Sequence, residues 1–205
     1  MQSLEDILES IWSRLAAALE DPASPLRVPV VATASADGVP GARAMVLRAI
    51  NQQQGQVVLF SDRRGRKVED LSANPLAELV FYDPTAQGED RTQYRMSGAV
   101  TLARDADAQA IWDELPWTQK LLYSATPAPG STIPEPSSGL SDALFGPDLS
   151  EAEKHAHLQD GFANFSVITI QIEQIDWLLI TPDGNRAARY HRDKTGNWHS
   201  SWRIP

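Results

Sequence analysis

Apolar residues recur every three or four positions near the start of the chain, which predicts an amphipathic helix over residues 4–20. The positions that would share its buried face are Leu4, Ile7, Leu8, Ile11, Trp12, Leu15 and Leu19. Ser3, followed by Asp6, has the spacing of a helix N-cap whose carboxylate reaches back. We expect this helix to cover one end of a sheet.

From Val28 onward the hydrophobic period changes to two, which is typical of strands. The turn at residues 36–38 predicts a hairpin between a strand at 28–35 and a strand at 42–50. Further strands are predicted at 57–61, 76–83, 91–103, 165–172, 175–180, 186–191 and 198–204. Because turns link most of these strands, the pattern favours an antiparallel barrel or sandwich, mainly β with flanking helices.

Four shorter segments have helical character: 64–73, 105–115, 119–124 and 150–159. The stretch from Thr126 to Pro147 is rich in Pro, Gly and Ser, so we expect a long loop that is either a lid or a disordered surface segment. The sequence contains no internal repeat. We therefore expect a single domain over residues 1–205.

Composition narrows the function classes. The 205 residues carry a net charge of −9, which argues against a general nucleic-acid binder. With no cysteine there are neither disulfides nor thiolate metal sites, and no histidine spacing indicates a metal centre. Neither a signal sequence nor an apolar run of membrane-spanning length is present, so we expect a cytoplasmic protein without membrane contact.

Positive charge gathers locally against this acidic background. Between residues 43 and 67 there are six Lys or Arg and one acid, Asp62. Arg43 would share a strand face with Met45 and Leu47, an unusual place for a charge that only aids solubility. Arg66 and Lys67 begin the following helix, where free N–H groups also attract anions. The cluster indicates a phosphate grip for a cofactor; the alternative is a solvated basic surface.

A family resemblance adds to this interpretation. Arg43-Ala44-Met45-Val46-Leu47-Arg48, Phe60-Ser61, Gly65-Arg66-Lys67 and Asn74-Pro75 resemble, in this order, the FMN-binding signature of the pyridoxamine 5′-phosphate oxidase family. The resemblance continues at Gln93 and Gly98 and resumes near the end of the chain at Trp177, Arg189-Tyr190-His191 and Trp198 to Pro205.

The resemblance implies an antiparallel split β-barrel that forms a homodimer, with FMN in a cleft between the subunits. Arg43, Arg66 and Lys67 would hold its phosphate. The remaining cofactor-binding residues that it implies are Met45, Val46, Leu47, Arg48, Phe60, Ser61, Gln93, Trp177 and Arg189. Trp177 and Arg189 would come from the partner subunit. Arg189 and His191 would bind substrate, and no catalytic residue is assigned.

The substrate half of the family pattern is only partly kept. On the helix where the family carries a Tyr, an Arg and a Ser for the substrate phosphate, this sequence has Trp112, Pro116 and Lys120. A second phosphate-contacting segment would fall near residues 124–126 without a secure match. We therefore expect an FMN-dependent oxidoreductase that acts on an unidentified small molecule. The alternatives are a non-catalytic flavin carrier, an authentic pyridoxamine 5′-phosphate oxidase, and a split barrel with a deazaflavin or haem.

Overall fold

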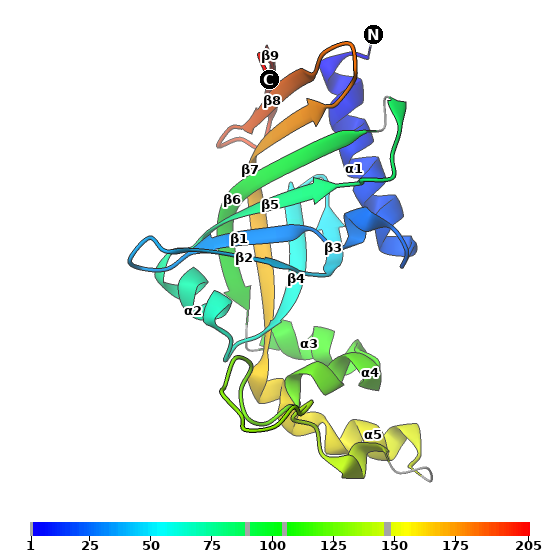
Figure 1. The fold of residues 1–205 in the computed structure, drawn as a ribbon, viewed down its shortest axis with the longest axis vertical. Helices are drawn as coiled ribbons and strands as arrows, with labels where there is room; N and C mark the ends of the chain where they lie inside the picture. Colours follow the sequence, from blue (N-terminus) through cyan, green and yellow to red (C-terminus); the bar gives the residue numbers. More distant parts are fainter. Residues whose placement is uncertain (1, 89–90, 104–105, 146–148) are drawn as a thin grey trace.

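The computed structural model describes residues 2–88, 91–103, 106–145 and 149–205, apart from the side chain of residue 143. In this part of the chain nine strands form one antiparallel sheet (Figure 1). They are β1 (Val30–Ala34), β2 (Pro40–Ala44), β3 (Leu47–Asn51), β4 (Gln56–Asp62), β5 (Leu76–Tyr82), β6 (Thr92–Ala103), β7 (Phe165–Leu179), β8 (Arg186–Arg192) and β9 (Trp198–Arg203).

Two long strands, β6 and β7, form the spine of the sheet. Along one edge β7 pairs with β6; along its other edge the first half pairs with β4 and the second half with β8. The register of the spine shifts between Ser97 and Gly98. A Cβ atom at residue 98 would overlap the carbonyl oxygen of Gln171, so the two backbones can approach this closely only because residue 98 is glycine.

The order of the main path is β2-β1-β5-β6-β7-β4-β3, with β8 and β9 extending from β7. No pairing joins β2 to β3 within the described residues, so the sheet remains open. The predicted fold class, an antiparallel split barrel that is mainly β with flanking helices, is confirmed.

The first helix, α1 (Leu4–Glu20), agrees with its prediction. Ser3 Oγ accepts a hydrogen bond from the Asp6 amide, and the Asp6 carboxylate accepts one from the Ser3 amide, at 3.1 and 3.0 Å. A short 3₁₀ turn, η1 (Pro25–Arg27), follows the helix. The residues that α1 buries are Ile7, Ile11, Trp12, Leu15 and Ala18. It packs against β3 and β9 at one end of the sheet (Figure 1).

The remaining helices lie beside or below the sheet (Figure 1). Helix α2 (Arg66–Ala73) follows β4 and contacts β1. The lower lobe contains α3 (Ala106–Glu114), α4 (Trp117–Lys120), η3 (Leu121–Tyr123), η4 (Asp142–Phe145), α5 (Glu151–His157) and η5 (Gln159–Asn164). Residue 105, the first of its predicted helix, lies outside the described residues.

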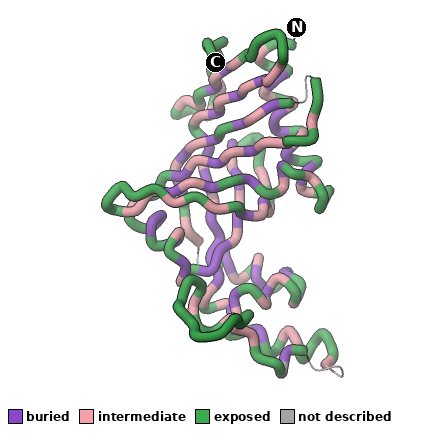
Figure 2. Tube along the Cα trace, in the orientation of Figure 1, coloured by how far each residue is buried: buried purple, intermediate pink, exposed green. Residues whose placement is uncertain are grey.

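Two hydrophobic clusters stabilise these layers. The larger one joins the sheet to α1, and the smaller one, around Trp112, Tyr123 and Phe165, joins the lower lobe to β7. Residues 126–141 form no helix or strand and are largely exposed, as expected for the predicted loop (Figure 2). The last two residues of that prediction, 146 and 147, lie outside the described residues. No described helix has the length and apolar character to cross a membrane.

Two strand predictions are wrong in their extent. The predicted strand over 42–50 is interrupted at Met45 and Val46, because β2 pairs with β1 whereas β3 pairs with β4. The two strands predicted at 165–172 and 175–180 are the single strand β7. In both cases the hydrophobic pattern reports which residues are buried, and burial does not reveal when a strand changes its partner.

Candidate functional site

A cavity of about 240 Å³ lies where the chain passes from β2 to β3. We call it the cationic cavity; its walls are Ala44, Met45, Val46, Arg48, Phe60, Ser61, Asp62, Lys67, Leu122 and Tyr123. The break between the strands brings Met45 and Val46 to the wall. The end of β4 brings Phe60 and Ser61, and η3 closes the cavity from the lower lobe. Six of the sequence-predicted cofactor residues line it.

Arg43, Arg66 and Asp70 do not line the cavity but lie next to Lys67 at its α2 end. Lys67 Nζ donates a hydrogen bond of 3.1 Å to Ser61 Oγ. Burial, followed by the nearby Arg43 guanidinium, lowers the pKa of Lys67. The guanidinium groups of Arg43 and Arg66 both lie 3.9 Å from the buried carboxylate of Asp70. Two of the residues predicted to bind a phosphate, Arg43 and Arg66, therefore share one acid, and the third, Lys67, lies beside Arg43.

The opposite end of the cationic cavity is aromatic. The Arg48 guanidinium lies over the Phe60 ring at 5.4 Å, and burial is the main cause that lowers the pKa of Arg48. In the part of the chain that the structure describes, no carboxylate pairs with Arg48. Phe60 packs edge-on against Phe165 at 5.2 Å, and Tyr123 packs on the same ring at 4.9 Å. Burial raises the pKa of Tyr123 to about 12, so its phenol stays neutral at ordinary pH.

Not every charge of the basic segment belongs to this cavity. Arg64 forms a two-pronged ion pair with Asp62 at 3.0 and 2.6 Å, and it also donates to the carbonyl oxygen of Ala125. Arg63 is exposed. Leu47, which the resemblance placed near the cofactor, has its side chain in the main hydrophobic core; it does not line the cavity.

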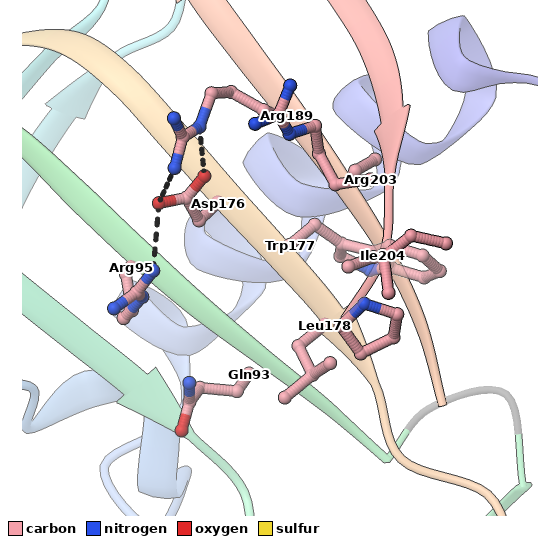
Figure 3. A pocket seen from close by; sticks show the side chains of 11 residues that line it. Gln93, Arg95, Asp176, Trp177, Leu178, Arg189, Arg203 and Ile204 are labelled. Carbon is pink, nitrogen blue, oxygen red and sulfur yellow. Dashed lines mark hydrogen bonds and ion pairs between the residues drawn. The ribbon is translucent and has the colours of Figure 1, made fainter. Parts of the chain in front are cut away.

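Three other predicted residues, from β6, β7 and β8, line a different cavity, of about 380 Å³ (Figure 3). We call it the C-terminal cavity; Gln93, Trp177 and Arg189 lie in its walls together with Arg95, Arg203 and Pro205. Asp176 accepts two hydrogen bonds from Arg189, at 2.7 and 3.2 Å, and one from Arg95 at 3.0 Å. The hydrogen bond and charge of Asp176 raise the pKa of Arg189. The two cavities have no residue in common.

His191 lines neither of these two cavities. It is exposed on β8 and lines a third, open cavity beside Gln171 and Glu173, so in one chain it does not share a cavity with Arg189. Among the described residues, no three His, Asp or Glu side chains are grouped as a metal site would require. Arg189 and His191 alternate with the buried Ala188 and Tyr190, so they share one face of β8 but line different cavities.

The helix that carries the substrate-phosphate residues in the family is used differently here. Trp112 is fully buried in the aromatic cluster of the lower lobe. Lys120 is also buried: its Nζ lies 3.2 Å from Nδ1 of His155 and 5.3 Å from the centre of the Trp112 ring. Burial lowers the pKa of Lys120. Neither residue lines the cationic cavity.

Several residues of this region were missed by sequence reasoning. Leu122 and Tyr123 reach the cavity through tertiary packing, for which the sequence carries no local signal. Asp70 did have a signal, since it follows Arg66 by four positions and Lys67 by three. That spacing puts all three side chains on one face of a helix.

Comparison with known proteins agrees with the motifs. A family model described as pyridoxamine 5′-phosphate oxidase matches residues 15–131, more than half of the chain. A pyridoxine/pyridoxamine 5′-phosphate oxidase of Anaeromyxobacter dehalogenans is 36% identical over 86 residues, which is 42% of this chain and 40% of that protein. One from Pseudomonas fluorescens is 24% identical over 143 residues, 70% of this chain and 63% of the relative. The chain thus matches less than two thirds of the length of either relative.

Solved structures extend the likeness to the whole fold. A pyridoxamine 5′-phosphate oxidase-related, FMN binding protein from Nostoc punctiforme superposes with a TM-score of 0.73 at 23% identity, covering 100% of both chains. PhzG from Burkholderia lata, in complex with tetrahydrophenazine-1-carboxylic acid, gives a TM-score of 0.66 at 15% identity, covering 96% of this chain and 92% of that one. At these identities the structures support the fold, and the family model supports the family. The chain belongs to the pyridoxamine 5′-phosphate oxidase family.

Proposed function

We propose that this protein binds FMN in the cationic cavity and is an oxidoreductase acting on a small molecule. The observation that carries the proposal is a cavity with Lys67 in one end, Arg43 and Arg66 next to that end, and aromatic side chains at the other end. A phosphomonoester carries close to two negative charges at neutral pH. Arginine and lysine at the start of a helix suit such a group.

The residues present fit the two ends of FMN. Its phosphate would be held by the three cations, with Lys67 already directed toward Ser61 at 3.1 Å. The planar ring would lie against the backbone of residues 45–47 and the Phe60-Ser61 pair. Met45 is almost fully buried and makes this part of the wall apolar. Such a wall excludes water from one side of the ring.

When bound, FMN would supply the redox chemistry, and the protein would supply binding, orientation and charge. Arg48 is the cation nearest the aromatic end, stacked on Phe60 at 5.4 Å. A fixed positive charge there would stabilise negative charge that develops on a bound ligand. Tyr123, held neutral by a pKa of about 12, can donate a hydrogen bond but does not add a competing negative charge.

We further propose that the active form is a homodimer with the site between subunits. Gln93, Trp177 and Arg189 would close the ring end from the partner chain. This arrangement reconciles the single site implied by the family motifs with the two separate cavities of one chain. His191 would join Arg189 in binding substrate across the same interface.

The substrate is expected to differ from pyridoxamine 5′-phosphate. The helix that would grip a substrate phosphate offers the buried Trp112 and a Lys120 that already contacts His155. Arg48 would be the main remaining cation for an acidic substrate group. A direct assay tests this point: formation of pyridoxal phosphate with oxygen uptake would favour the authentic oxidase.

The test of the whole proposal is the absorption spectrum of the native protein, followed by mass identification of the small molecules released on denaturation. We expect a flavin spectrum and the mass of FMN. A deazaflavin or haem, or no affinity for added FMN, would contradict the proposal. If FMN binds but no metabolite or nicotinamide donor reduces it, the protein is a flavin carrier and the oxidoreductase part is wrong.

A further inference from the structure

We propose that Thr33, together with Asp70 and Gly41, positions Arg43 for the phosphate, so that the anion grip depends on residues that never touch the ligand. The inference rests on the proposed function, because it concerns the same site. It assigns to three residues of β1, α2 and β2 a role that the cofactor motifs leave out.

The first observation is a chain of short hydrogen bonds. Arg43 Nη1 donates to Thr33 Oγ1 at 2.8 Å, and Thr33 Oγ1 donates in turn to Asp70 Oδ2 at 3.0 Å. Thr33 and Asp70 are 5% and 4% exposed, so both groups are withdrawn from water. The Thr33 hydroxyl donates to a carboxylate and accepts from a guanidinium, so both of its hydrogen-bonding directions are used. These two bonds fix the orientation of the Arg43 side chain.

The second observation is the space left by Gly41. In the β1–β2 ladder Thr33 pairs with Gly41, and Val31 pairs with Arg43. A Cβ atom at residue 41 would lie 2.8 Å from Nη2 of Arg43. The guanidinium thus folds back along its own strand into the place that a side chain at residue 41 would occupy.

The third observation is the balance of charge. Arg43 and Arg66 flank the buried carboxylate of Asp70, and Lys67 lies beside Arg43, so three positive charges accompany this acid. The other nearby acid, Asp62, is already paired with Arg64. The difference, +2, matches the charge of a phosphomonoester dianion at neutral pH. Without a carboxylate beneath them, three neighbouring cations would repel one another and turn toward solvent. Asp70 therefore keeps Arg43 and Arg66 near the cavity while leaving enough positive charge for the phosphate.

A purely structural role for the same contacts gives a different experimental result. If Thr33 and Asp70 only hold α2 against the sheet, their replacement should weaken the binding of every ligand of the cavity to the same extent. If they position Arg43, their replacement should weaken the binding of FMN but not of riboflavin, which has the same ring and no phosphate.

The principal test is Thr33→Val, which keeps the shape of the side chain and removes the hydroxyl. Dissociation constants for FMN and riboflavin are measured by quenching of flavin fluorescence. We expect FMN binding to weaken about tenfold, as for the loss of one charge-assisted hydrogen bond, with riboflavin binding unchanged. Thr101→Val, at an exposed position of β6, is the matched control and should change neither constant.

A second variant leaves every charge and hydroxyl in place. Gly41→Ala meets only the end of a flexible side chain, so the fold is kept while the Arg43 guanidinium is displaced. It should weaken FMN binding selectively, as Thr33→Val does. In a protein that already carries Arg43→Ala, neither substitution should weaken FMN binding further, because both act through that arginine.

Asp70→Asn tests the carboxylate, since its amide oxygen can still accept from Thr33. Weaker FMN binding with unchanged riboflavin binding supports the positioning role. Tighter FMN binding would overturn it, because the carboxylate would then only oppose the phosphate. The inference fails, and the proposed function stands, if the unchanged protein binds FMN and the variants weaken FMN and riboflavin binding equally. The same conclusion holds if the variants weaken the binding of neither flavin. If the unchanged protein does not bind FMN, both fail.

Discussion

The basic residues between positions 43 and 67 differ in their surroundings, and these differences separate their roles. Arg64 is neutralised by Asp62 at 2.6 Å, so it is a structural cation. Among the described residues, the hydrogen-bond partner of the Lys67 amine is the Ser61 hydroxyl, and burial lowers the pKa of Lys67. Arg66 is 69% exposed, and its guanidinium lies 3.9 Å from Asp70. A count of charges along the sequence identifies the basic segment at residues 43–67, but it does not show which of its cations are available to a ligand.

The paired loss of two phosphate contacts should be large. In Arg66→Ala/Lys67→Ala we expect FMN affinity to fall at least about a hundredfold, because each charge-assisted contact contributes roughly 1.5–3 kcal/mol. Titration with FMN measures the effect, and thermal unfolding checks that the fold is kept. Arg63→Ala/Lys194→Ala removes the same charge from exposed positions and should bind FMN normally. An unchanged FMN affinity in the first variant would refute the phosphate grip.

The lowered pKa of Lys67 predicts a pH dependence of binding. Burial disfavours its charged form, so in the free protein the amine loses its proton at a lower pH than an ordinary lysine does. A bound phosphate favours the protonated amine. Affinity for FMN should therefore fall as pH rises through the lowered pKa of Lys67, below the usual lysine value of 10.5.

The same residue supplies the control. Lys67→Arg keeps its charge at alkaline pH, so its FMN affinity should be nearly constant from neutral pH to about pH 10. Tyr123→Phe should retain the alkaline decrease, since the pKa of Tyr123 is raised to about 12 and lies above this window. An alkaline decrease that persists in Lys67→Arg would assign the titration to another group.

At the scale of elements, the sequence predicts what is local and misses what depends on partners. The cap of α1 and the strand periods were recognisable because each involves residues a few positions apart. The break at Met45 and Val46 was not, because β2 and β3 diverge to pair with β1 and β4. That break forms a wall of the cationic cavity. The motif thus predicts residues that line this cavity, whereas the shape of the cavity depends on tertiary structure.

The β6–β7 spine should be intolerant of a side chain at residue 98. In Gly98→Ala the new Cβ would overlap a backbone carbonyl of Gln171, which cannot move aside as a side chain can. Overpacking of this kind costs about 3 kcal/mol or more, so the melting temperature should fall by roughly 6–12 °C. Gly41→Ala, another glycine within a strand, is the control and should change the free energy of unfolding by less than about 1 kcal/mol.

At the scale of the whole molecule, the residues of the family motifs are divided between two cavities. The cationic cavity lies where β2, β4 and α2 meet, and the C-terminal cavity lies along β7 and β8. Family motifs predict a single site, and the chain separates their residues. A site shared between two copies satisfies both observations. Each subunit would contribute its cations to one site and its Gln93, Trp177 and Arg189 to the other.

Mixed dimers test this arrangement. One subunit carries Arg66→Ala/Lys67→Ala, and the other carries Gln93→Ala/Arg189→Ala; each variant alone should bind FMN poorly in both of its sites. If the sites are shared, a heterodimer has one site with both defects and one with none. We expect the isolated heterodimer, purified through two different tags, to bind one FMN with the affinity of the unchanged protein. If each site belongs to one chain, every site of the heterodimer keeps a defect, and tight binding is not recovered. A monomer in analytical ultracentrifugation would likewise contradict the shared site.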